Sequence, residues 1–244
     1  MIVIIRIQAQ EKPELLWNDV LSNKDKLQEV LGTKGKILYL SKRRNYNEIS
    51  LFVHVADTNI LGDFIAGHLA NLEGVTGIWL INMLNPVFYP LPKEAGQRSD
   101  SGVPTQSGRS EVESRRISGM KRYTVTLKVY SPKLSEIYKA LANLPPSEDV
   151  SIGYLAYTCH LFGDCIQISL QAPDDISIRK YVDEVIGKIP GVLRTTTCEI
   201  EKTNPFVSYE EWQKYISRNA VMVDWDEQHM VAQFSAVSEP IGHN

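Results

Sequence analysis

The chain has 244 residues, of which 43% are hydrophobic, and its formal net charge is −3 at pH 7. This composition is typical of a globular protein and excludes the strongly basic character of most nucleic-acid-binding domains. Three cysteines without Cys-x-x-Cys spacing (Cys159, Cys165 and Cys198) exclude a disulfide framework and favour a reducing, cytoplasmic location. The sequence shows no signal-peptide core and no apolar run of about 20 residues, so no membrane partner is expected.

Residues 1–92 predict one structural unit of order β-α-β-β-α-β. Residues 2–9 form a dense apolar run, which is typical of a central strand. A helix follows, with Pro13 in its first turn and Gly32 as its stop signal. The remaining expected elements are strands at 36–41 and 49–55, a helix at 61–72 and a last strand at 77–83.

Residues 121–207 predict a second unit with the same order of elements. The expected elements are a strand at 123–129, a helix at 134–144, strands at 150–159 and 165–170, a helix at 178–189 and a last strand from 192. The segment 93–120 contains six serines and four glycines without apolar periodicity, and we interpret it as a linker. Residues 208–244 form a C-terminal extension, in which a capping box at Ser208 predicts a helix that carries Trp212 and Tyr215.

The two units share more than their order of elements, which indicates a duplicated domain. Gly-Val opens the last strand at 74–75 and at 191–192, and an Asn-Pro pair follows it at 85–86 and at 204–205. A βαββαβ unit folds as an antiparallel sheet with both helices on one face, so the other face needs a cover. We therefore expect an α+β fold of two ferredoxin-like units, of the dimeric α/β-barrel type, with the antiparallel sheets packed face to face.

Three short motifs of the second unit support a family resemblance. They are the Gly163-Asp164 hairpin, the Asp-rich helix start at 173–175 and the run Gly-Val-Leu-Arg-Thr-Thr-Thr at 191–197. With these motifs the unit resembles the ligand-binding (RAM) domain of Lrp/AsnC-type transcription regulators. The first unit matches in layout, with Asn47-Glu48 where Gly-Asp is expected. The family's helix-turn-helix has no place before a first strand that begins the sequence, so direct sequence-specific binding of nucleic acid is not expected.

The resemblance implies a module that binds a small-molecule effector, expected to be an amino acid, and that forms a homo-oligomer or joins a partner regulator of transcription. It implies no enzyme activity and no cofactor. The ligand-binding residues that we predict are Thr158, Gly163, Asp164, Thr195 and Thr197. A carboxylate at 164 would pair with a ligand ammonium, and the backbone N–H at 163 would bind a carboxylate. The structural alternative is a tight turn that needs Gly and Asp, followed by threonines that pack in a strand.

Other functions are also compatible with the sequence. An enzyme of the dimeric α/β-barrel class, haem-linked or monooxygenase-like, is the alternative, and an interaction scaffold is the third possibility. A histidine that points into the space between the sheets would favour the enzyme. No metal site is expected, although Cys159, His160 and Cys165 are zinc-ligand types near one hairpin. The basic triplet at 42–44 is expected at a hairpin tip, either solvated or in contact with an anion.

Overall fold

The computed structural model describes residues 1–88, 119–144, 147, 149–159, 164–208, 211, 212, 214, 215, 221 and 222. The first unit contains β1 (Ile2–Ala9), α1 (Pro13–Ser22), α2 (Lys24–Leu31), β2 (Gly35–Arg43), β3 (Glu48–Val55), α3 (Asn59–Gly67), the 3-10 turn η1 (Leu69–Asn71) and β4 (Val75–Phe88). The second contains β5 (Lys121–Val129), η2 (Ser131–Lys133), α5 (Leu134–Ala142), β6 (Ser151–Cys159), β7 (Asp164–Ala172), α6 (Asp175–Tyr181), the π-helical η3 (Val182–Ile186) and β8 (Val192–Pro205). The short strand β9 (Val221–Met222) follows.

Each half of the chain therefore has the predicted order of elements, with one difference in the first unit. The helix expected to run to Gly32 is divided into α1 and α2 at Asn23. The Asn23 amide donates to the carbonyl of Asp19 at 3.0 Å and to its carboxylate at 2.7 Å. Asparagine side chains that bond the local backbone in this way compete with helix continuation, which explains the break.

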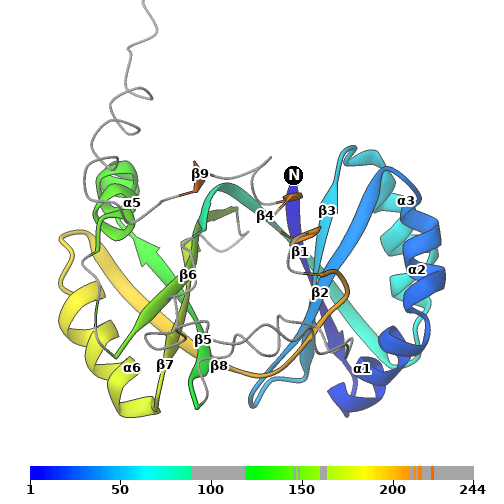
Figure 1. Ribbon diagram of the computed structural model, residues 1–244, viewed down its shortest axis with the longest axis horizontal. Coiled ribbons are helices and arrows are strands. Elements are labelled where there is room, and N and C mark those ends of the chain that lie inside the picture. Colours follow the sequence, from blue (N-terminus) through cyan, green and yellow to red (C-terminus); the bar gives the residue numbers. More distant parts are fainter. Residues whose placement is uncertain are drawn as a thin grey trace, which may run out of the picture.

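Each unit has its own core between its sheet and its helices. In β1 the side chains of Val3, Ile5 and Ile7 lie in the core of the first unit, whereas Ile2 and Ile4 lie on the opposite face of the strand. This alternation is the period-two pattern of a strand with two different environments. Figure 1 shows the helices of the two units on opposite outer sides of the ring of strands. The inner faces of both sheets consequently point toward each other across one shared interior.

The two sheets face each other across this interior and also join at their edges, so that they close into one eight-stranded antiparallel barrel. The strand order is β1-β3-β2-β8-β5-β7-β6-β4, and a β1–β4 pairing completes the ring. The predicted α+β class with antiparallel strands is confirmed, and the structure adds edge-to-edge pairing at two seams, which the sequence analysis did not predict. The physical reason is that each open sheet has edge strands with unpaired N–H and C=O groups, and pairing them with the other unit removes both edges.

The repeated Asn-Pro motifs lie at these two seams. β4 pairs with β1 over its first half and with β6 over its second half, where the register shifts around Asn85 and Pro86. β8 does the same with β5 and β2, and Asn204 and Pro205 pair with residues of β2. Both last strands have 14 residues, which is long enough to serve the two neighbours in turn. The shared exit motif of the two repeats thus marks the segments that join one unit to the other.

The beginning of the C-terminal extension packs on the barrel. The backbone N–H of Glu211 donates to the Ser208 hydroxyl at 3.2 Å, as the capping-box pattern predicts. The ring of Trp212 lies against Tyr39 and Phe88, with centroid distances of 5.9 and 5.8 Å. Among the described residues no helix is long and apolar enough to cross a membrane.

Candidate functional site inside the barrel

A cavity of about 140 Å³ lies in the interior that the two sheets share. Its lining side chains come from seven of the eight barrel strands, which places the cavity inside the ring. The lining residues are Arg6, Arg43, Ile81, Thr126, Thr158, Gln167 and Thr196. One side of the cavity therefore carries two guanidinium groups, and the other carries hydroxyl and amide groups.

Arg43 is held rigidly at the end of β2. Its Nη1 donates to the Glu48 carboxylate at 2.6 Å, and its Nε donates to the Cys198 sulfur at 3.0 Å. Its guanidinium also lies 4.2 Å from the ring centroid of Tyr46. Only 9% of the Arg43 side chain and 14% of the Glu48 side chain are exposed, so the ion pair is shielded from solvent screening. Burial raises the pKa of the Cys198 thiol, which opposes the effect of Arg43 and keeps the sulfur protonated.

Arg6 lies near the centre of β1 and is the second cation of the cavity. Its Nε is buried without a hydrogen-bond partner, and the described part of the chain contains no salt bridge to its guanidinium. Burial lowers the pKa of Arg6 from its usual value, and the neighbouring Arg43 lowers it further, while Glu48 acts in the opposite direction. Arginine nevertheless stays protonated in proteins. The three charges of Arg6, Arg43 and Glu48 therefore add up to one net positive charge beside the cavity.

The opposite wall is built from neighbouring strands in register. Thr126 of β5 pairs with Thr196 of β8 on one side and with Gln167 of β7 on the other, so the three side chains stand next to one another on the inner face. Gln167 donates through Nε2 to the hydroxyl of Tyr154. Burial raises the pKa of Tyr154 to about 12, so this phenol stays neutral.

Another part of the barrel interior is filled by aromatic and aliphatic side chains. Tyr39 stacks on Phe52 at 4.1 Å between centroids, and Tyr154 lies 6.4 Å from Phe52 and 5.9 Å from Phe88. Trp212 of the C-terminal segment joins the same group. We call these five residues the aromatic cluster. The polar cavity therefore lies beside a packed aromatic part of the same interior.

The structure separates the predicted ligand-binding residues. Thr158 lines the cavity. Thr195 and Thr197 pair with Leu127 and Val125, whose side chains lie in the core of the second unit, so these threonines share the outer face and Thr196 between them points inward. Ligand binding by these threonines stays a prediction.

The hairpin residues of that prediction lie largely outside the described structure. Gly163 is outside the described residues, and Asp164 is described only as the first backbone position of β7, opposite Lys128. Ligand binding at this hairpin therefore also stays a prediction.

The alternation of residues along the strands indicates that Arg6 and Arg43 point into the barrel, whereas the short motifs do not include these residues. Arg6 interrupts an apolar strand at a position whose neighbours two and four residues earlier, Ile4 and Ile2, point into the barrel. In the basic triplet, Arg43 points inward, whereas Lys42 points outward to Glu14 and Glu201 and Arg44 pairs with Glu199 at 2.7 Å. A strand alternation at 42–44 would have distinguished these roles, but we expected a hairpin tip there.

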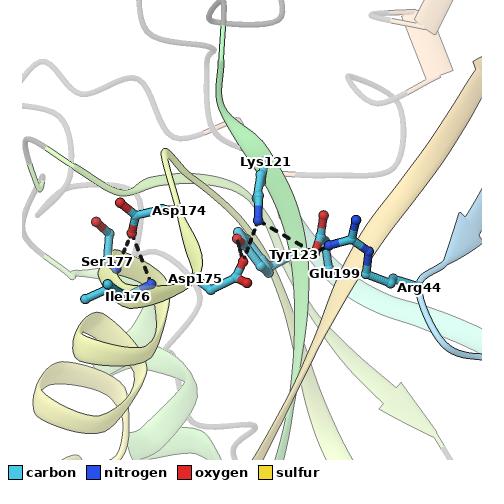
Figure 2. A network of polar contacts seen from close by, with 8 residues as sticks. All are labelled: Arg44, Lys121, Tyr123, Asp174, Asp175, Ile176, Ser177 and Glu199. Atoms are coloured by element: carbon cyan, nitrogen blue, oxygen red, sulfur yellow. Dashed lines mark hydrogen bonds and ion pairs between the residues drawn. The ribbon is translucent and has the colours of Figure 1, made fainter.

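A second polar cluster lies outside the barrel and has a structural role (Figure 2). Lys121 contacts Asp175 at 2.9 Å and Glu199 at 4.0 Å, and the Tyr123 hydroxyl donates to Asp175 at 2.6 Å. Arg44 of the first unit reaches the same Glu199. These groups satisfy one another, so the cluster links the start of α6 to β5, to β8 and to the β2–β3 hairpin.

The cavity does not fit a haem, and the described residues contain no cluster of three or more metal-ligand side chains. A cavity of about 150 Å³ holds a single benzene ring, whereas a porphyrin is several times larger. His54 faces the interior, but its ring lies 4.8 Å from that of Tyr215, in the part that the aromatic cluster fills. His160 and the side chains of Cys159 and Cys165 lie outside the described structure.

Comparisons with known proteins found similarity only at the level of structure. No family model and no curated protein matches the chain. A candidate monooxygenase from Lactobacillus acidophilus NCFM has 8% identity and a TM-score of 0.45, over 84% of this chain and 95% of that protein. An anthrone oxidase-like protein has 10% identity and a TM-score of 0.43, over 85% and 95%. Chlorite dismutase from Candidatus Nitrospira defluvii, in complex with imidazole, has 12% identity and a TM-score of 0.45, over 88% and 94%.

These findings correct the family prediction. The matching structures are described as enzymes or as enzyme-like proteins, so the resemblance to Lrp/AsnC effector domains is wrong. The predicted amino-acid-binding regulatory module is wrong on the same finding, and so is the expectation that the chain is not an enzyme. The physical reason is that the quoted motifs serve the topology. Gly191 adopts φ = 101° where β8 begins, and threonines suit any strand.

Proposed function

We propose that the chain is an enzyme that acts on a small organic molecule inside the barrel, and that Arg6 stabilises negative charge on an oxygen of that molecule. The observation that carries this proposal is the Arg6 guanidinium, which faces the cavity with a buried Nε that has no hydrogen-bond partner. A buried cation that forms no salt bridge is unfavourable, and an anionic oxygen of a ligand would offset that cost. Donors that are fixed before the reaction, in a site with little water, are among the largest contributions to enzyme catalysis.

The fixed geometry of the neighbouring groups supports this role. Arg43 is already bound to Glu48 and Cys198, so it adds positive potential without reorienting. The potential lowers the pKa of an acidic O–H, or of a C–H next to a carbonyl, in a bound molecule. The proton passes to water, and the resulting phenolate or enolate is the reactive form, whose oxygen receives charge-assisted hydrogen bonds from Arg6. Thr126, Thr196 and Gln167 bind the other polar groups of the substrate.

The test uses one-ring phenols and enolisable ketones. We first titrate the protein with 4-nitrophenol, whose absorbance reports its ionisation, and expect binding to lower the pKa of the phenol. The panel is then incubated with the protein in air-saturated deuterated buffer, and oxygen uptake, deuterium incorporation and product masses are measured. Turnover of at least one compound supports the enzyme assignment.

Variants of two arginines show whether Arg6 is responsible. Loss of one charge-stabilising donor typically reduces kcat about 10²–10³-fold, so Arg6→Gln should lower kcat/KM by about that factor, and Arg6→Lys should retain part of the rate. Arg179 is exposed on α6 outside the barrel, and Arg179→Gln is the matched control. The proposal is wrong if nothing in the panel reacts, or if Arg6→Gln behaves like the control.

A further inference from the structure

We infer that the cavity takes a one-ring molecule with a single negative charge, and that Tyr154 sets this size limit. The inference deepens the proposed function, since it names the substrate class of the same site. It is nevertheless tested by binding, which requires no turnover.

The size limit follows from the volume that the interior leaves free. The cavity measures about 140 Å³, close to the engineered cavity of about 150 Å³ that binds benzene. The part of the interior that holds Tyr154 is occupied by the other members of the aromatic cluster and by aliphatic side chains such as Ile4 and Met83. A second fused ring has no room unless one of these side chains is displaced.

The charge limit follows from the ion pairs around the cavity. Among the charged groups that line the cavity or contact its lining residues, Glu48 neutralises Arg43, and Arg6 contributes the charge that remains. Arg122, further along the inner face of β5, does not line the cavity. One anionic oxygen therefore balances the site. A second negative charge on the ligand would be buried beside hydroxyls and an amide, which do not compensate a full charge.

Tyr154 is a member of the aromatic cluster that also contacts the wall of the cavity. Its hydroxyl accepts a hydrogen bond from Gln167, which lines the cavity, and its ring packs against Phe52 and Phe88. The residue is only 8% exposed, so its ring fills space that a larger ligand would need. Shortening this side chain extends the cavity toward the cluster, whereas shortening Phe88 opens space one layer further away.

The experiment measures dissociation constants by titration calorimetry for three probes: 4-nitrophenol (one ring), 2-naphthol (two rings) and benzene-1,4-dicarboxylate (one ring, two negative charges). The pH is held where 4-nitrophenol and 2-naphthol are both ionised, so that these two probes carry the same charge and differ in size. The wild-type protein should bind 4-nitrophenolate at least tenfold more tightly than either other probe. In Tyr154→Leu the preference over 2-naphthol should shrink at least tenfold, while Tyr154→Phe, which keeps the ring, and Phe88→Leu should retain it.

Near-ultraviolet circular dichroism confirms that each variant is folded, and Tyr154→Phe keeps the test decisive if the leucine variant does not fold. Equal binding of one-ring and two-ring probes by the wild-type protein, or a relaxed preference in Tyr154→Phe, overturns the inference. So does the absence of binding of every probe at millimolar concentration. Selective binding without any turnover would contradict the proposed enzyme function but not the inferred substrate class. Turnover of larger or dianionic substrates would support the enzyme function and contradict the inferred substrate class.

Discussion

Replacing Arg6 with methionine should make the unliganded protein more stable. The buried Nε without a partner costs about 1–3 kcal/mol. The repulsion between Arg43 and Arg6 is stronger than the attraction between Glu48 and Arg6. Removing the charge of Arg6 therefore removes little favourable electrostatic energy. Methionine is unbranched and adaptable, and it would extend the apolar surface that Ile4 and Ile81 already form. We expect a net gain of about 1–2 kcal/mol in the free energy of unfolding.

The gain is measurable by urea unfolding, followed by tryptophan fluorescence and far-ultraviolet circular dichroism. For a chain of this size each kcal/mol corresponds to about 2–4 °C in Tm. Because a guanidinium does not titrate in the accessible range, the gain should be the same at pH 6 and pH 9.

Arg43→Met is the control, and its effect has the opposite sign. It leaves the Glu48 carboxylate, 14% exposed, without its partner, which should reduce stability by about 3–5 kcal/mol. An Arg6→Met protein that is equal to or less stable than the parent would refute the description of Arg6 as an uncompensated buried charge.

Three further changes test the fold. Asp174 accepts hydrogen bonds from two backbone N–H groups at the start of α6, and these bonds lower the pKa of its carboxyl group. The stabilising contribution of Asp174 should therefore be complete above pH 3.8 and be lost as the pH falls through the lowered pKa. Asp174→Ala should reduce Tm by about 2–4 °C at pH 7 and remove this pH dependence. At Gly191 the backbone has φ = 101°, and an added Cβ would lie only 2.9 Å from the Ile137 side chain. Gly191→Ala should therefore lower the free energy of unfolding in urea by about 2–3 kcal/mol. Gly74→Ala, at φ = 77° with open space around it, should lower it by about 1 kcal/mol. Trp212→Ala should cost about 1–3 kcal/mol and accelerate amide hydrogen exchange at the C-terminal end of β4, and unchanged exchange would show that the extension does not protect that seam.

The sequence was sufficient for the elements and for their repeated order, because both depend on local patterns. Alternating residues in β5 and the apolar run of β1 predict strands whatever the partner strands are. Closure of the barrel is different, since it depends on which edges meet over long separations in sequence. Asn85-Pro86 and Asn204-Pro205 showed that the two units end alike, but not that these motifs face the other unit.

The site was missed because its residues are spread over the whole chain. Arg6 and Thr196 are 190 positions apart and meet only after the ring closes. The motifs that suggested a ligand site instead, the Gly163-Asp164 hairpin and the threonines of β8, are local, and Thr195 and Thr197 face outward. A local motif reflects what a single strand or turn requires, whereas a cavity depends on what several strands enclose. The local motifs were therefore a poor guide to function.

A better criterion for function in this fold is a conflict between a residue and its position. In β1 the inward positions carry Ile2, Ile4 and then Arg6, so a charge follows two apolar residues on a face that is otherwise buried. A sequence selected only for stability would have another aliphatic side chain at this position, because it would be consistent with the buried face of the strand. Local choices that lower stability without compensation in the folded chain are expected where binding or catalysis needs them. By this reasoning Arg6 could have been proposed from the strand pattern alone, and the structure adds that no acid within the described residues forms a salt bridge with it.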